Sequence, residues 1–237
     1  MGALRNIKVL DLSRILAGPY STQILSDLGA EIWKVESPWG DDTRQWGPPF
    51  LNKESSYYLS ANRGKKSLII NLKSEKGQNI IKDLAKKADI LVENFKVGNL
   101  AKFGLDYKSL SEINPKLIYA SVTGFGQTGP RSSEPGYDAA LQGMTGIMSV
   151  TGEPDGRPTK VGVAWIDILT GLNATIGILG ALNERNTSGL GQHIDVSLFD
   201  VGIASMGYLA QNYLATGISA TRIGNAHPQV APYQDFE

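Results

Sequence analysis

The sequence IKVLDLSRILAGPYSTQILSDLGAEIWKVE at residues 7–36 decides the fold class, because it encodes a strand, a helix and another strand in succession. Residues 7–12 and 31–35 are short runs rich in apolar and β-branched side chains, which is typical of strands. Residues 21–28, after Pro19, have the apolar spacing of a helix. A strand–helix–strand unit of this length predicts two parallel strands with the helix packed across them.

The same alternation continues along the next stretch of the chain. Further strands are predicted at 67–72, 90–95 and 117–122, and a helix at 74–87 begins with Ser74 as its N-cap. We therefore predict an α/β fold whose open, mainly parallel sheet carries helices on both faces.

The last hundred residues change to helical segments rich in small and apolar side chains. Ala, Gly, Leu and Ile dominate residues 138–148, 168–185 and 201–215, which predicts helices that are buried or packed against a partner subunit. Residues 193–198 add one more strand. Residues 224–237 are rich in turn formers, and we expect them to end at a truncation point rather than a natural terminus.

The composition argues against several classes of function. Among 237 residues, 23 Lys and Arg balance 23 Asp and Glu, so no overall positive field would attract nucleic acid or an anionic membrane. We expect neither partner. The chain has no cysteine, which excludes disulfides, thiolate metal sites and cysteine nucleophiles. We read no signal peptide and no apolar run of membrane-spanning length, and we expect a cytoplasmic protein, or a mitochondrial-matrix protein if a presequence was removed.

The common catalytic motifs are missing from the sequence. The turn after the first predicted strand, LSRILAGP, has one glycine where a dinucleotide-binding loop has three. The two histidines, His193 and His227, lie far apart and lack metal-ligand spacing, so we predict no metal site. A carboxylate is then the best candidate for a nucleophile, because it is ionised at neutral pH and needs no histidine partner.

Two aspartates precede apolar helical runs. Asp167 lies in GVAWIDILTGLNATIG and Asp138 in PGYDAALQGM. An aspartate at this place is most often an N-cap, since its carboxylate accepts the unpaired N–H groups of the first turn. The same helix end also favours a bound anion, so pattern alone leaves both roles open.

Seven pieces of sequence together resemble one known family. They are VLDLSRILAGP at 9–19, LGAEIWKVE at 28–36, GDDTR at 40–44, LVENF at 91–95, SVTGFGQTGP at 121–130, GYD at 136–138 and TSGLGQHIDVSLFD at 187–200. In this order and spacing they resemble the class III CoA-transferases, of the formyl-CoA transferase and carnitine CoA-transferase type. The resemblance implies a Rossmann-like large domain at 1–223, a linker beginning at 224–237, a smaller domain beyond it, and an interlocked homodimer.

The resemblance also implies the chemistry and the site. Asp167 aligns with the catalytic aspartate, which attacks an acyl-CoA thioester to give an aspartyl anhydride and then an aspartyl-CoA thioester. Tyr137 and Asp138 match the acyl pocket. Coenzyme A and its acyl esters are then substrates, no cofactor is tightly bound, and the partner substrate is a small carboxylic acid. The positions that match CoA contacts are Leu16, Ala17, Lys73, Asn94, Phe95 and Lys102.

Departures from the family pattern bear on the substrate. Ser37 and Lys102 replace arginines that contact CoA in formyl-CoA transferases, which predicts less bidentate phosphate binding. The segment GDDTRQWGPPF at 40–50 is closer to the branch that uses succinyl-CoA and dicarboxylic acids such as hydroxymethylglutarate.

Two other functions remain open from the sequence. An α-methylacyl-CoA racemase would carry histidine at the position of Tyr137, and tyrosine is a poor base at neutral pH. A non-catalytic CoA-binding or dimerisation protein would keep the scaffold without the nucleophile, whereas Asp167 is present.

Overall fold

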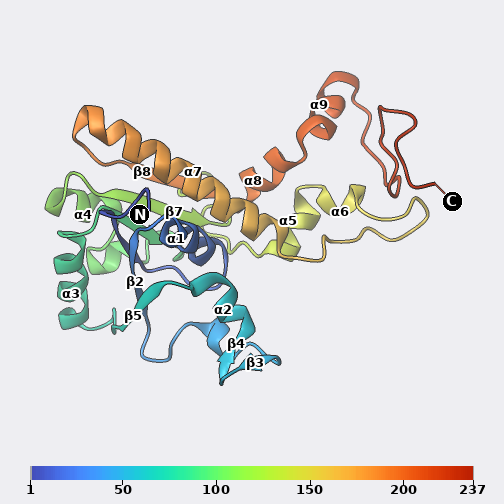
Figure 1. The fold of residues 1–237 in the computed structure, drawn as a ribbon. Helices are drawn as coiled ribbons and strands as arrows, with labels where there is room; N and C mark the ends of the chain where they lie inside the picture. The colour runs from blue at the N-terminus through green and yellow to red at the C-terminus, as the bar shows by residue number, and fades with distance from the viewer. Residues whose placement is uncertain (1, 237) are drawn as a thin grey trace.

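A six-stranded, wholly parallel sheet forms the centre of the computed structural model, which describes residues 2–236 (Figure 1). The strand order is β5-β2-β1-β6-β7-β8. The strands are β1 (Lys8–Asp11), β2 (Glu31–Glu36), β5 (Lys65–Ile69), β6 (Ile90–Glu93), β7 (Ile118–Thr123) and β8 (His193–Ser197). The predicted α/β fold with a parallel sheet is therefore confirmed.

The strand order reverses direction once, between β1 and β6. From β1 the chain moves outward through β2 to β5, then returns to add β6 beside β1 and continues through β7 to β8. In open α/β sheets a ligand crevice forms beyond the carboxyl ends of the strands at such a point. The loops after β1 and β6 are thus the first place to look for a site.

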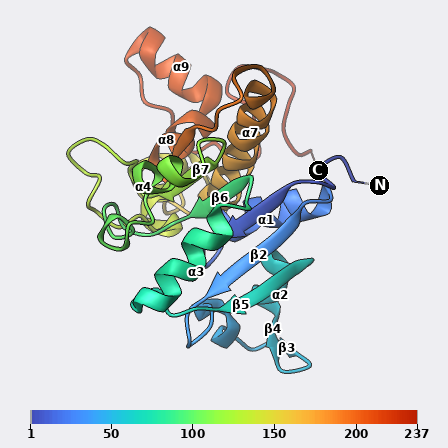
Figure 2. The ribbon, with the colours of Figure 1, turned by 90° about the vertical axis from the view of Figure 1, so that its left-hand side faces the viewer.

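Helices cover both faces of the sheet, because neighbouring residues of each strand point to opposite sides. On one face, Val9 and Ile90 pack in one buried cluster with Leu25 of α1 (Ala17–Asp27) and Ile178 of α7 (Trp165–Ser188). On the other, Leu10 and its neighbours pack against α3 (Glu75–Ala85) and α4 (Tyr107–Ile113) (Figure 2).

The remaining elements are short and lie around this core. They are the 3-10 helices η1 (Asp42–Gln45) and η2 (Ala101–Phe103), the paired strands β3 (Phe50–Leu51) and β4 (Glu54–Ser55), and the helices α2 (Ser56–Asn62), α5 (Asp138–Met144), α6 (Ile147–Val150), α8 (Leu198–Ser205) and α9 (Gly207–Thr216).

Several predicted boundaries were wrong, and glycine accounts for two of them. Gly146 has a left-handed φ of 91° and splits the helix expected at 138–148 into α5 and α6. Gly207, with φ of 51°, separates α8 from α9 within the helix expected at 201–215. The first helix begins four residues earlier than Ser21, because Pro19 is tolerated in its first turn.

The helix α7 is long and apolar enough to cross a membrane by length and composition, and no other helix in residues 2–236 is. One such helix is weak evidence for a membrane span, since a helix in the core of a domain passes the same test. Here Ile166, Ala174 and Ile178 of α7 are fully buried within the domain.

The helices α1 and α7 pack directly against each other, and a glycine permits the contact. A Cβ atom on Gly171 would lie 2.7 Å from the Ala17 carbonyl oxygen and 3.1 Å from the Tyr20 ring. This contact brings the beginning of α1 beside the beginning of α7.

The contact predicts the effect of a methyl group. Gly171→Ala should lower the free energy of unfolding by about 1–3 kcal/mol, because backbone atoms must move apart. Gly180→Ala is the matched control in the same helix, where a Cβ meets nothing within 4 Å. It should raise the free energy of unfolding by roughly 0.5–1 kcal/mol through helix propensity. Urea unfolding of both variants at one protein concentration checks this, and equal effects would contradict it.

Candidate active site

Asp167 lies in the first turn of α7 and is half-buried. The helix begins at Trp165, and the residue at its N-cap position, Ala164, makes no side-chain cap. Asp167 is therefore inside the helix rather than at its cap. Its carboxylate projects from the end of a helix whose partial positive charge favours an anion.

The cap of α7 comes from Asp138, which lies at the start of a different helix. Oδ1 of Asp138 accepts hydrogen bonds from the backbone N–H groups of Ile166 at 2.8 Å and Asp167 at 3.3 Å. Oδ2 of Asp138 accepts from the side-chain amide of Gln142 at 2.6 Å. The capping role foreseen for Asp138 is thus real, but it serves α7 and not α5.

The side chain of Gln142 connects the Asp138 carboxylate to the segment that precedes α7. Its side chain is fully buried, and its amide oxygen accepts from the N–H of Val161 at 2.8 Å. One amide group thereby holds both the carboxylate of Asp138 and the chain just before Asp167. Sequence reasoning missed this role, since a glutamine in a helix forms no motif.

The neighbouring carboxylate of Asp138 affects the ionisation of Asp167. Burial and the negative charge of Asp138 together raise the pKa of Asp167 to about 7. Burial also raises the pKa of Tyr57 to about 12, with the charges of Asp167 and Asp138 adding to the effect. Tyr57 therefore keeps its proton and can donate a hydrogen bond beside the two carboxylates.

Tyr57 was not among the residues predicted for the site. Its ring meets Trp46 edge to face at 5.0 Å, and both line an open depression with Pro48, Pro49 and Ser60. The adjacent Tyr58 is a core residue with 8% of its surface exposed. In the sequence the pair Tyr57–Tyr58 reads as two core aromatics, so nothing singled out the first.

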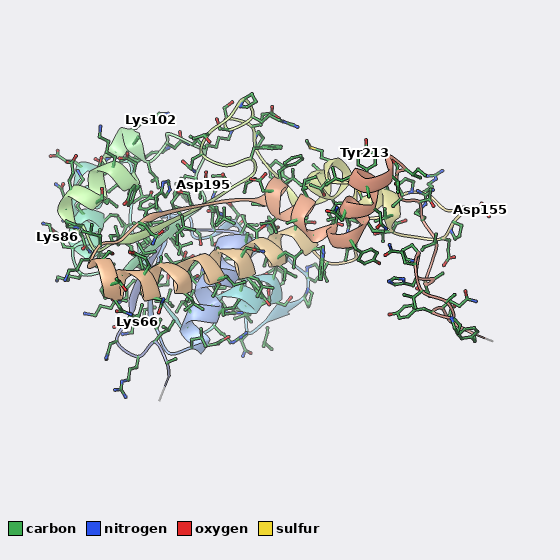
Figure 3. The ribbon with its side chains drawn as sticks, turned by 90° about the horizontal axis from the view of Figure 1, so that it is seen from above. Lys66, Lys86, Lys102, Asp155, Asp195 and Tyr213 are labelled. Carbon is green, nitrogen blue, oxygen red and sulfur yellow. The ribbon has the colours of Figure 1, made fainter. Side chains whose placement is uncertain are left out.

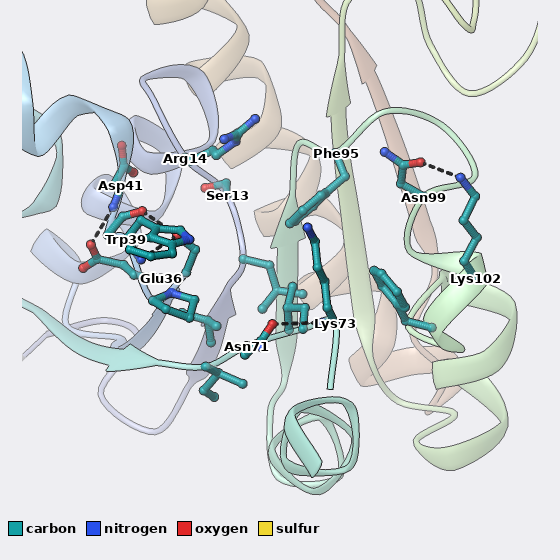
Figure 4. Close-up of a pocket in the computed structure, with 18 residues that line it drawn as sticks. Ser13, Arg14, Glu36, Trp39, Asp41, Asn71, Lys73, Phe95, Asn99 and Lys102 are labelled. Atoms are coloured by element: carbon teal, nitrogen blue, oxygen red, sulfur yellow. Dashed lines mark hydrogen bonds between the residues drawn. The ribbon is translucent and has the colours of Figure 1, made fainter. Parts of the chain in front are cut away.

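A cavity of about 770 Å³ lies at the carboxyl ends of the central strands (Figure 4). Three of the residues predicted to contact CoA, namely Lys73, Phe95 and Lys102, line it. They come from the loops after β5 and β6, which place two ammonium groups and one aromatic ring around the same space. Trp39, exposed over 88% of its surface, lines the opposite wall.

The other predicted CoA contacts lie beside this cavity. Leu16 and Ala17 are buried, at 8% and 5% exposure, in the turn between β1 and α1. The side chain of Asn94 is engaged with that turn, since its Oδ1 accepts from the N–H of Arg14 at 3.0 Å and its Nδ2 donates to the Arg14 carbonyl at 2.7 Å. These residues shape the turn, and their contact with CoA stays a prediction.

Two buried lysines also stabilise the turn between β1 and α1 through hydrogen bonds. Lys34 donates to the Ser13 carbonyl and to Asp41, each at 3.0 Å. Lys65 donates to Asp11 at 3.0 Å and to the Pro19 carbonyl at 2.9 Å. Burial lowers the pKa of Lys65 to about 8, and Asp11 opposes that shift. The turn also holds Ile15 at a φ of 70°, which is strained for a β-branched residue.

Residues 4–237 match the family described as CoA-transferase family III. The chain belongs to this family. It is 50% identical, over 98% of its length, to a succinate–glutarate CoA-transferase of Agrobacterium fabrum, and 48% identical, over 99%, to the human succinyl-CoA:glutarate CoA-transferase. It spans 60% and 54% of those two proteins.

A solved member of the same fold agrees with this family assignment. The crystal structure of a CAIB/BAIF family protein from Brucella suis superposes with a TM-score of 0.95 at 52% identity. The match covers all of this chain and 64% of that one. The resemblance to class III CoA-transferases seen in the sequence is therefore confirmed.

No group of three or more metal-ligating side chains gathers anywhere in residues 2–236. The two histidines are engaged with other neighbours. His193 shares a 2.9 Å hydrogen bond with Ser121, and His227 stacks on Tyr208 at 5.4 Å.

The carboxylate pair predicts a change in titration. Asp138→Asn keeps an oxygen that can cap α7 but removes the negative charge, so the pKa of Asp167 should fall below about 7 while burial keeps it above its usual range. A raised carboxyl pKa favours the protonated folded chain, so stability declines as pH rises from about 4 to about 7. That decline should be smaller in the variant.

Carbon-13 NMR of the Asp167 carboxyl and urea unfolding across this pH range test the expectation. Asp138→Ala is the matched variant, since it removes both the charge and the cap and should cost a further 0.5–2 kcal/mol or so. An unchanged Asp167 pKa in Asp138→Asn would mean that burial alone sets it.

Proposed function

We propose that this chain carries the nucleophile and the CoA-ester site of an enzyme that transfers coenzyme A from an acyl-CoA to a carboxylic acid. The observation that carries the proposal is Asp167, a half-buried carboxylate at a helix start, next to a second carboxylate and without a histidine partner. Its raised pKa makes the ionised form more basic, and hence a better nucleophile, than a solvated carboxylate.

The proposed reaction proceeds through four acyl transfers. The Asp167 carboxylate attacks the donor thioester carbonyl and expels CoA thiolate, which leaves an aspartyl anhydride. The thiolate attacks the aspartyl carbonyl, releasing the donor acid as its carboxylate and leaving an aspartyl-CoA thioester. The acceptor carboxylate attacks that thioester to form a new anhydride, and the thiolate then attacks its acceptor carbonyl. The products are the new acyl-CoA and free Asp167.

Neighbouring groups support these steps. Tyr57 keeps its proton to pH values well above neutral, so its hydroxyl can donate to negative charge that develops on a carbonyl oxygen. Lys73 and Lys102 would meet CoA phosphates, and the Phe95 ring offers an apolar face for the adenine. We place the acyl group near Tyr137 and Asp138, as the resemblance implies.

For the substrates, we propose succinyl-CoA as donor and a dicarboxylic acid of the glutarate class as acceptor. The support is the 48–50% identity to relatives named for these acids. A racemase on this scaffold is not favoured, because Tyr137 stands 71% exposed at the position of the histidine base and both histidines contact other residues.

We further propose that the protein is a homodimer. Large apolar side chains on α7 and α9 are exposed in the single chain, with Ile176 at 67%, Leu214 at 76% and Tyr213 at 52%. Figure 3 shows Tyr213 at the far end of the molecule from Lys66 and Lys86, and Figure 1 shows α9 projecting away from the sheet. Exposed apolar side chains gathered on α7 and α9 are typical of a surface that a second subunit covers.

The proposed cellular location is the cytoplasm, or the mitochondrial matrix if a presequence precedes the chain. The absence of cysteine fits a protein that does not depend on an oxidising compartment for disulfides. The balanced charge gives no reason to expect a membrane surface or nucleic acid as partner.

A covalent adduct on Asp167 would test the mechanism. Incubation with succinyl-CoA and no acceptor should add the mass of CoA less water to the peptide that contains Trp165 and Asp167, and hydroxylamine should remove it. Asp167→Ala should abolish both adduct and transfer to glutarate. An unmodified peptide in a sample that still transfers CoA would move the nucleophile to another residue.

Phosphate recognition by Lys73 gives a separate test. Lys73→Ala should weaken CoA binding about threefold to tenfold, and the wild-type affinity should fall as salt rises. Lys76→Ala is the matched control, because Lys76 is an exposed lysine of α3 outside the cavity. Isothermal titration with CoA measures both. Equal losses in the two variants would argue against the placement of the phosphates.

A further inference from the structure

Three consecutive residues at the end of β6 connect the core to the large cavity. The carboxyl of Glu93 is buried, with 4% of the residue exposed, and its Oε2 accepts from the backbone N–H of Phe95 at 2.8 Å. Asn94 holds the turn after β1 through both polar groups of its amide. Phe95 lines the cavity. The position of the Phe95 backbone therefore depends on the Glu93 carboxyl.

The Glu93 carboxyl is also linked to solvent through the neighbouring strands. Glu93 of β6 pairs in register with Ser121 of β7, and the Ser121 hydroxyl donates to the carboxylate. The same hydroxyl lies 2.9 Å from Nε2 of His193, which is exposed and stacks on Tyr107 at 5.0 Å. Carboxyl, hydroxyl and imidazole thus form one hydrogen-bonded chain from the buried group to the surface.

This chain can accommodate either protonation state of Glu93. With Glu93 ionised, Ser121 donates to the carboxylate, and an Nε2–H of His193 donates to Ser121. With Glu93 protonated, its O–H donates to Ser121, which donates in turn to an unprotonated Nε2. Reversal of the hydrogen bonds keeps every buried polar group paired, so a proton can be gained or lost without leaving an unsatisfied group.

Space is available for the Phe95 segment to respond. A second cavity of about 280 Å³ is lined by Glu93, Ser121, Tyr107 and His193, and Phe95 lines it as well as the larger one. Phe95 therefore borders both cavities, while it also packs against the buried cluster around Leu10.

We propose that Glu93 is a positioning residue for the CoA-ester pocket. Its protonation state, which changes by proton exchange through Ser121 and His193, determines the positions of Asn94 and Phe95 at the pocket and hence the binding of the anionic ligand. The proposal rests on the CoA site proposed above. An ionised carboxylate holds the Phe95 N–H with a charge-assisted hydrogen bond, whereas a protonated one holds it more weakly.

The expected direction of the pH effect follows from the charges. Burial and the charge of Asp195 on β8 together raise the pKa of Glu93 to about 7, against the hydrogen bonds from Ser121 and Phe95. The other titratable groups near it are Tyr119 on β7 and residues that line the second cavity, namely Lys96, Asp106, Tyr107, Lys108 and His193. The ionised form holds Phe95 more firmly, but its negative charge behind the pocket repels a polyanionic ligand. We expect the repulsion to dominate, so CoA should bind more tightly below pH 7 than above it.

NMR of the chain without ligand tests the link between Glu93 and Phe95. The backbone amide signal of Phe95 should titrate with a midpoint near pH 7 in the wild type and stay constant in Glu93→Gln, whose amide oxygen can still accept the hydrogen bond. Glu112→Gln is the matched control, because it removes the same charge from an exposed position on α4. A Phe95 signal that titrates equally in all three proteins would overturn the proposal.

Isothermal titration with CoA at pH 6 and pH 8 tests the consequence. The dissociation constant of the wild type and of Glu112→Gln should rise about threefold more between these pH values than that of Glu93→Gln. Titration of the ligand phosphates occurs with all three proteins and cancels in this comparison. Identical pH dependence in the three proteins would overturn the proposal. Absence of CoA binding at both pH values, with the Phe95 signal still titrating, would instead overturn the proposed CoA site.

Discussion

The hydrogen bonds from the start of α7 to the Asp138 carboxylate are the interaction on which the site depends. A first-turn aspartate would normally be stabilised by unpaired backbone N–H groups. Here Asp138 takes the N–H groups of Ile166 and Asp167. Burial and the negative charge of Asp138 then make the Asp167 carboxylate more basic. A single cap thus fixes the geometry of the helix end and activates the group on it.

The close approach of α1 and α7 brings the first turn of α7, with Asp167, beside the start of α1, and residues 12–14 of the turn before α1 line the cavity of about 770 Å³. Gly171, one turn after Asp167, lies against the backbone of Ala17, so the first turns of both helices meet. The turn before Ala17 carries strain at Ile15, and the buried lysines Lys34 and Lys65 and the amide of Asn94 hold it in place. This turn, rather than any one side chain, connects the helix end that carries Asp167 to the cavity.

The sequence predicted local features well and distant pairings poorly. Apolar, β-branched runs set by burial predicted β1, β2, β6 and β7, and the parallel sheet followed from alternation with helices. The edge strand β5 is mostly exposed and begins two residues before its predicted start, and the short pair β3 and β4 was not predicted. Asp167 was predicted as the catalytic residue through the family resemblance, and its role stays a prediction. The partner that Asp138 caps lies 28 residues away, so its role depends on how α5 packs against α7. Tyr57 and Gln142 belong to no motif, and Glu93 lies in the LVENF piece at 91–95 but was assigned no role from it. The roles of these residues arise from burial and from contacts between elements that only the fold brings together.

Two carboxyl groups with a pKa near 7 serve the proposed reaction in opposite directions. Transfer needs Asp167 ionised, and this form gains population as pH rises through about 7. The anionic ligand favours protonated Glu93, and that form loses population over the same range. The turnover of bound substrate and the affinity for substrate therefore change in opposite senses around neutral pH. Their product, which governs the rate at low substrate concentration, is greatest where both forms coexist. Burial of these two carboxyls is enough to set that optimum, because each desolvated group titrates well above its value in water.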